Sequence, residues 1–234
     1  MMAGAVLWPG VQPALGALVP FAGCRTVGQT ESIKAPKGAS KDAPLSATVA
    51  RELAFYREFE GVGVLAPRGW HCLGVYGSSG NDLLVSPDPI RPARVGNFSG
   101  PAIAVSRRRD ENSGRYDVAE LIARIFPVFR DYLTRKSVEA DLSLQYSTFA
   151  PYPKDRLTYL SDSVVEYNTP AGTAGLGTHS EWLRANGSPI QGVAILTMGD
   201  ISETLVLSVR LPAGLAGLTP EVVRQFERDA ARRK

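Results

Sequence analysis

Apolar residues recur at helical spacing in three parts of the chain. Val49 to Phe59 is expected to form an amphipathic helix, because its apolar residues lie three or four positions apart between charged ones. Asp117 to Leu133 carries a longer apolar stripe, and an acidic residue three positions after its start has the spacing of a capping box. Pro127 is expected to kink or split this helix. A last helix is expected to begin at Thr219, with a proline in its first turn.

Short runs rich in β-branched and aromatic residues predict strands. Residues 190–198 are nearly all apolar, which predicts a central strand buried on both faces. Residues 204–211 alternate apolar and polar positions, which predicts a half-exposed strand. The short Gly199-Asp200 link predicts that these two strands pair as an antiparallel hairpin. Further strands are expected at Val62–Ala66, Trp70–Tyr76, Leu83–Val85, Pro101–Ser106, Leu142–Tyr146, Leu157–Leu160 and Val164–Tyr167.

The order of these elements predicts the fold class. A helix, several strands, a long helix, more strands and a final helix are typical of an α+β domain with an antiparallel sheet covered by helices, an arrangement like an α/β/α sandwich. Evenly spaced strand–helix–strand repeats are absent from the sequence, which disfavours a doubly wound nucleotide-binding fold. We therefore expect one globular domain over residues 48–234.

The amino-terminal part of the chain differs from this domain in composition. Residues 1–24 contain no Asp, Glu, Lys, Arg or His, and they are mainly small and apolar. Three prolines make a transmembrane helix a poor interpretation, so a secretory signal over residues 1–23 is expected. Residues 25–47 hold mostly Gly, Pro, Ser, Thr and Lys, which predicts a flexible tether.

Phe21-Ala22-Gly23-Cys24 resembles the lipobox of bacterial lipoproteins, in which small residues precede a Cys that receives lipid. The resemblance implies lipidation of Cys24, attachment to a membrane through that lipid, and a periplasm-facing location. Arg25 follows the Cys where proteins retained at the inner membrane often have Asp, which slightly favours the outer membrane. Phe21 and the uncharged start depart from the family pattern. An uncleaved apolar segment with an incidental Cys, or a cytosolic domain with a misassigned start, remain the alternatives.

Composition and charge exclude several classes of protein. The 234 residues include 26 Lys+Arg and 23 Asp+Glu, a formal charge of +3, which is too small to indicate a nucleic-acid partner. The basic runs at 107–109 and 232–234 are expected to be solvated surface. Two His and two Cys residues, without metal-ligand spacing, predict no metal site, and no motif indicates a cofactor.

Cys72 and His179 are the only candidates for catalysis. If Cys24 carries lipid, Cys72 is the remaining thiol, and His179 is a possible base for it. His71 is a poor base, because neighbouring residues of a strand point to opposite faces. A buried, inert Cys72 is the expected alternative. A glycine-rich loop beside His179 suggests a binding rim, whose candidate residues are Arg68, Trp70, His71, Gly175, Gly177, His179 and Trp182.

Ala66-Pro67-Arg68-Gly69-Trp70, placed between a helix and a strand, is similar to the entry of PsbP-like α/β/α sandwich domains. That family consists mostly of non-catalytic accessory proteins, so the resemblance implies a binding domain with an envelope protein or peptide as partner. We therefore expect a lipid-anchored envelope protein with a non-catalytic binding or accessory domain. An envelope hydrolase or transferase that uses Cys72 or His179 is the alternative.

Overall fold

The computed structural model describes residues 16–28, 31–92, 97–139, 149–180 and 182–233 and has an α+β fold. Nine strands form the main sheet in the order β11-β12-β13-β14-β10-β9-β8-β3-β4. All neighbours in it pair antiparallel except β3 and β8, which are parallel. Two smaller sheets, β2-β6-β7 and β1-β5, accompany it.

The strands are β1 (Ala17–Val19), β2 (Phe21–Gly23), β3 (Thr26–Val27), β4 (Ser32–Ile33), β5 (Lys41–Ala43), β6 (Leu53–Arg57), β7 (Val64–Pro67), β8 (His71–Gly77), β9 (Gly80–Ser86), β10 (Ala102–Arg109), β11 (Arg156–Ser161), β12 (Val164–Thr169), β13 (Ile190–Thr197) and β14 (Glu203–Arg210). The α-helices are α1 (Ala47–Glu52), α2 (Gly114–Ile125), α3 (Arg130–Glu139), α4 (Leu176–His179) and α5 (Thr219–Ala231). Short 3-10 helices occupy Pro127–Phe129 and Ala213–Leu218.

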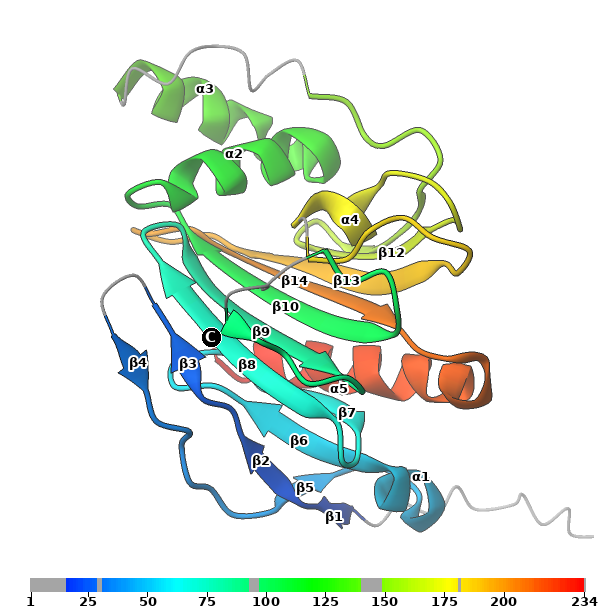
Figure 1. The fold of residues 1–234 in the computed structure, drawn as a ribbon. Coiled ribbons are helices and arrows are strands. Elements are labelled where there is room, and N and C mark those ends of the chain that lie inside the picture. The colour runs from blue at the N-terminus through cyan, green and yellow to red at the C-terminus, as the bar shows by residue number, and fades with distance from the viewer. Residues whose placement is uncertain (1–15, 29–30, 93–96, 140–148, 181, 234) are drawn as a thin grey trace, which may run out of the picture.

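Both faces of the main sheet are covered. Helices α2, α3 and α4 lie over one face, and α5 lies across the other together with the three-stranded sheet (Figure 1). Side chains of the central strands alternate between these two cores: Val105 and Leu207 belong to the α5 core, and Leu196 and Val206 to the α2 core. The structure is richer in sheet than the expected sandwich, because the α5 side includes a second sheet beside its helix.

Most elements predicted from apolar patterning are present. The expected hairpin is formed by β13 and β14, which pair antiparallel from Gln191 with Val209 to Thr197 with Glu203. The long helix is split at Pro127 into α2 and α3, as expected from the lost amide hydrogen. Strands β7 to β12 lie where strands were expected. The strand predicted at 142–146 lies outside the described residues.

Three local predictions were wrong. Only the start of the helix predicted at 49–59 is helical; Leu53–Arg57 is strand β6, because it pairs with β2 and β7 and buries Leu53 to Tyr56. Helix α2 begins at Gly114, so Asp117 lies in its first turn and is not its cap. Strand β14 is buried along nearly its whole length, because helices cover both faces of the sheet there.

The segment expected to be a signal end and a tether is part of the folded sheets. Strand β2 pairs in parallel with β6, and β3 pairs in parallel with β8. Val19 and Cys24 are buried in the α5 core. The predicted boundary at Thr48 therefore differs from the structure, because β2 and β3 pair with strands 34 and 48 positions later in the chain, which leaves no local pattern. Among the described residues, no helix has the length and apolar character needed to cross a bilayer.

A disulfide joins this segment to the main sheet. Cys24, directly after β2, is bonded to Cys72 of β8, with the two Cα atoms 5.4 Å apart. The expectation that Cys72 lacks an intramolecular partner is thus corrected. The sulfur of Cys24 that was expected to carry lipid is in this bond instead.

The disulfide is expected to stabilise the fold by restricting the unfolded chain. For a sequence separation of 48 residues, loop-closure entropy gives about 4 kcal/mol. A double variant, Cys24→Ala with Cys72→Ala, is expected to lose most of this free energy of unfolding in urea titrations relative to the oxidised protein. Adding a reductant should destabilise the wild type and leave the double variant unchanged. Equal stability of the oxidised protein and the variant would contradict this role.

Glu227 of α5 has a carboxyl group whose ionisation the fold makes unfavourable. Burial, and then the neighbouring Glu166 of β12, raise the pKa of Glu227 from 4.5 to about 7. Its Oε1 atom is buried without a hydrogen-bond partner among the described residues. Ionised Glu227 is therefore disfavoured in the folded state.

This pKa shift predicts a specific pH dependence. Between pH 4.5 and about 7 the folded protein holds more protons at Glu227 than the unfolded chain does, so the stability contributed by this group falls as pH rises through that window. Glu227→Gln is expected to unfold at a higher temperature than wild type at pH 8, with the difference vanishing near pH 4.5. Glu52→Gln, at an exposed position, serves as the control in the same calorimetric series.

Candidate functional site

The structure separates the two residues considered for catalysis. Cys72 is in the disulfide and packs against the α5 core, whereas His179, at the end of α4, lines a pocket on the opposite, α2 face. No cysteine is free. A thiolate at Cys72 with His179 as its base is therefore absent from this structure.

The predicted binding rim is divided in the same way. Trp70 packs against the α5 core, and Trp182 packs with residues of the α2 face. Arg68 donates to the Ala50 and Leu53 carbonyls, which fixes it beside α1. His71 is exposed, while Gly175 and Gly177 belong to the start of α4. Only His179 of the expected rim faces a pocket of the α2 side.

The basic run at 107–109 is solvated at only one of its three residues: the side chain of Arg109 is 41% exposed, whereas those of Arg107 and Arg108 are 16% and 14% exposed. The strand places Arg107 and Arg109 on one side of the sheet and Arg108 on the other. Each has an acidic partner: Arg107 pairs with Glu203 at 2.6 Å, and Arg109 pairs with Glu111 at 2.7 Å. Arg108 is the most deeply placed of the three and organises the pocket described next.

We call the cavity between α2, α4 and the sheet the α2 pocket. It has a volume of about 310 Å³. Its floor comes from β10 and β14, which are adjacent in the sheet, and its walls come from α2 and α4. The lining residues are Ser106, Arg108, Asp117, Glu120, Leu121, His179, Ser180, Thr204 and Val206.

All three guanidinium nitrogens of Arg108 donate hydrogen bonds to the protein. Its Nε donates to Asp117 Oδ2 at 3.0 Å, and Nη2 donates to both carboxylate oxygens of Asp82 at 3.0 and 3.1 Å. Nη1 donates to the carbonyls of Asn81 and Arg107. Each of the three guanidinium nitrogens is therefore hydrogen-bonded to the protein, and the side chain is only 14% exposed.

The two carboxylates of the pocket wall each keep an open oxygen. Asp117 accepts from Arg108 through Oδ2, and Glu120 accepts from Arg124 through Oε1 at 2.8 Å. No described residue donates a hydrogen bond to Asp117 Oδ1 or Glu120 Oε2. Asp117 and Glu120 lie three positions apart on one helix, so both face the same cavity. Burial raises the pKa of Asp117, an effect that Arg108 partly offsets.

His179 is held against the carboxylate wall in its neutral form. Its Nδ1 lies 3.2 Å from the Tyr152 hydroxyl and 3.8 Å from Glu120 Oε1. Burial lowers the pKa of His179, and the opposing effect of Glu120 is smaller. Burial also raises the pKa of Tyr152. At neutral pH the imidazole therefore adds no positive charge to offset the acidic groups.

Ser106 places an unsatisfied hydroxyl in the floor of the pocket. The residue is only 5% exposed, and its Oγ has no hydrogen-bond partner among the described residues. An unmade hydrogen bond at a buried hydroxyl costs free energy, so such groups are uncommon in folded proteins. Ser208, on the same face of the neighbouring strand, shares a hydrogen bond of 2.7 Å with Tyr167.

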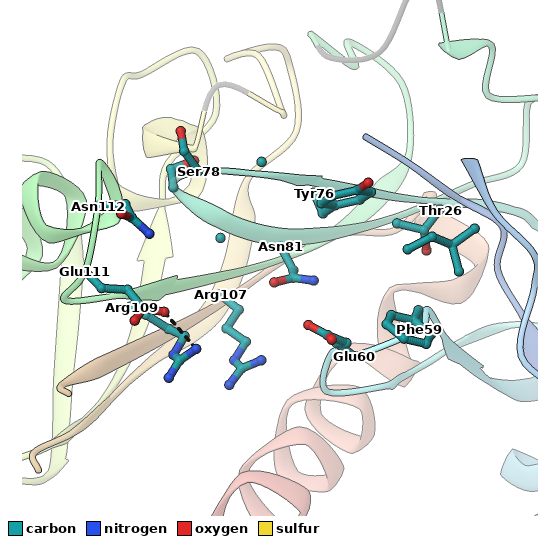
Figure 2. A pocket seen from close by; sticks show the side chains of 14 residues that line it. Thr26, Phe59, Glu60, Tyr76, Ser78, Asn81, Arg107, Arg109, Glu111 and Asn112 are labelled. Carbon is teal, nitrogen blue, oxygen red and sulfur yellow. Dashed lines mark ion pairs between the residues drawn. The ribbon is translucent and has the colours of Figure 1, made fainter. Parts of the chain in front are cut away.

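A second cavity, of about 300 Å³, lies beneath the β8–β9 hairpin, and we call it the hairpin pocket. Figure 2 shows Arg109 beside Glu111 on one side of it and Phe59 with Glu60 on the other. Both arginines that line it are already paired with acids. The α2 pocket is the better candidate, because it combines unpaired acceptors with a neutral imidazole.

Comparison with known proteins adds no relative: neither a family model nor a curated protein nor a solved structure matches the chain. Among the described residues, no group of three or more His, Cys, Asp or Glu side chains is arranged to hold a metal ion.

Of the residues that line the α2 pocket, the sequence pointed to His179 and gave no functional signal for Ser106, Arg108, Asp117 and Glu120. The acidic pair at 117 and 120 was visible but was interpreted as a helix cap.

The two serines give a matched test of this site. Ser106→Ala removes a buried hydroxyl without a partner, so it is expected to raise the free energy of unfolding by about 1 kcal/mol. Ser208→Ala removes a hydroxyl that is bonded to Tyr167 and is expected to lower it by about the same amount. Urea unfolding of both variants measures the difference. A destabilised Ser106→Ala protein would show that the hydroxyl is already satisfied.

Proposed function

We propose that this chain is an exported binding or accessory domain of a bacterial envelope that catalyses no reaction and is closed by the Cys24–Cys72 disulfide. The disulfide is the observation that carries the proposal. Disulfides persist in oxidising compartments such as the periplasm and are rare in the cytosol, where thiols are kept reduced. Cys24 is buried within the α5 core, so the bond is a structural one.

The chemistry of the candidate site favours binding over catalysis. A thiol enzyme needs a free thiolate beside a base, whereas the Cys72 sulfur is in the disulfide and lies on the other face of the sheet from His179. The imidazole of His179 is engaged by Tyr152 and Glu120. These contacts support a pocket that recognises a ligand and disfavour a hydrolase or transferase built on these residues.

The proposed protein is exported but is not anchored through a lipid on Cys24. One sulfur cannot carry both a thioether-linked lipid and a disulfide, and Cys24 has the disulfide. We retain the similarity to PsbP-like α/β/α domains as a proposal about the fold. Helices on both faces of an antiparallel sheet support it, and the second sheet beside α5 departs from it. An envelope protein or a peptide remains the proposed class of partner, with no role for nucleic acid.

Thiol trapping in cells tests the location. The full chain is expressed in a Gram-negative bacterium, quenched in acid, and labelled with a maleimide polymer before or after reduction. We expect no label before reduction and two labels after it, with the protein recovered in the periplasmic or envelope fraction. The Cys24→Ser, Cys72→Ser double variant should take no label in either case.

Two outcomes would contradict the proposal. Free thiols in the quenched cells would place the protein in a reducing compartment. A mass that corresponds to an acylated chain beginning at Cys24, together with release from the membrane by Cys24→Ala, would show a lipoprotein in place of the disulfide-closed domain. Intact-mass spectrometry of the purified protein separates these results from the expected loss of two hydrogens.

A further inference from the structure

We propose that the α2 pocket binds a primary ammonium group carried on a short aliphatic body. This inference rests on the binding role proposed above and specifies the ligand of that site. It follows from four features of the pocket: the charge of its wall, the committed donors of Arg108, the unsatisfied Ser106 hydroxyl and two apolar lining residues.

The pocket presents acceptors to a ligand. Arg108 is the only arginine or lysine among the described lining residues, and its three guanidinium nitrogens are bonded to Asp82, Asp117 and two carbonyls. Asp117 and Glu120 each retain one carboxylate oxygen without a hydrogen bond from a described residue. An anion entering here would meet two carboxylates beside a guanidinium whose nitrogens are all hydrogen-bonded to the protein already. A cation is therefore the matching charge.

The number of open acceptors matches an ammonium. A primary ammonium has three N–H donors. Asp117, Glu120 and Ser106 line one cavity, and each has an oxygen without a hydrogen-bond donor among the described residues: Asp117 Oδ1, Glu120 Oε2 and the buried Ser106 Oγ. The serine is an observation independent of the two carboxylates, because its hydroxyl is buried on β10 and has no hydrogen-bond partner among the described residues. A quaternary ammonium has no N–H and would leave all three unsatisfied.

The rest of the pocket limits the size and character of the ligand. Leu121 from α2 and Val206 from β14 add apolar surface beside the polar groups. The volume of about 310 Å³ is at the small end for ligand pockets. A chain of a few methylene groups attached to the ammonium satisfies both conditions.

Three probes of equal chain length test the chemistry. We would titrate the ¹⁵N-labelled, oxidised full chain with butylammonium, butyltrimethylammonium and pentanoate, each with a butyl chain, at pH 7.5 and constant ionic strength, following amide shifts. Butylammonium is expected to produce saturable shifts in α2, β10 and α4 with a Kd of about 1 mM or lower. The other two should produce none there. Equal responses to all three, or no saturation by butylammonium, would overturn the proposal.

Variants then assign the contacts. Glu120→Gln and Asp117→Asn are each expected to weaken butylammonium binding about tenfold, because each removes a charge-assisted hydrogen bond. Ser106→Ala, which disturbs no ion pair, is expected to weaken it about fivefold while the protein stays folded. Glu60→Gln, a carboxylate of the hairpin pocket, should bind as wild type does. Unchanged binding by both Ser106→Ala and Glu120→Gln would overturn the assignment.

Failure here is distinguishable from failure of the proposed function. The thiol-trapping assay reports the compartment and the disulfide, and it does not depend on the α2 pocket. A periplasmic, disulfide-bonded protein that ignores butylammonium would leave the exported binding domain standing and remove this ligand class. Free thiols in the cytosol together with specific butylammonium binding would contradict the exported location and support the ligand class.

Discussion

The burial of one guanidinium determines how the α2 side of the molecule is built. Arg108 lies between a helix and a sheet, where an unbonded N–H is costly, and each of its three guanidinium nitrogens is hydrogen-bonded to the protein. Those bonds tie β10 to Asp82 of β9 and to Asp117 of α2, and they add to the apolar contacts that hold the helix over the sheet. Because its donors are used internally, the cavity beside it is left with carboxylate oxygens and hydroxyls. The acceptor-rich lining of the α2 pocket is thus a consequence of the hydrogen bonds that Arg108 makes within the protein.

The sequence predicted those elements whose apolar pattern agrees with their environment. The β13–β14 hairpin and the break at Pro127 depend on short-range constraints, and both are present. The helix prediction was wrong at Leu53–Arg57. The apolar residues there are spaced as in a helix, but a strand that is buried on both faces can have the same pattern. Pairing with β2 and β7 decided between the two. The partners in β2 lie 34 positions earlier in the chain, a distance that no local window records.

The candidate site was less predictable than the fold for a related reason. His179 was noticeable as one of two histidines, but its neighbours come from β10, α2 and β14. Ser106 reaches this site through the register that places it opposite Val206, a hundred positions later in the chain. A serine within an apolar run and an Asp-x-x-Glu at a helix start are common in sequences and have local explanations. Only the sheet register and the position of α2 bring them to one cavity.

The same distinction explains the small residues before Cys24. Read locally, Phe21-Ala22-Gly23-Cys24 resembles a processing site, where small residues suit a protease. In the fold these residues form β2 beside β6, and Cys24 donates its amide to the Arg57 carbonyl at 2.9 Å. A Cβ at position 23 would collide with the Pro36 carbonyl, so glycine is required there by packing. Cys24 is buried next to Cys72 by the same strand geometry. The fold therefore requires small residues here whether or not the chain is processed at this point. The close packing of β2 that requires them also brings the sulfurs of Cys24 and Cys72 within bonding distance.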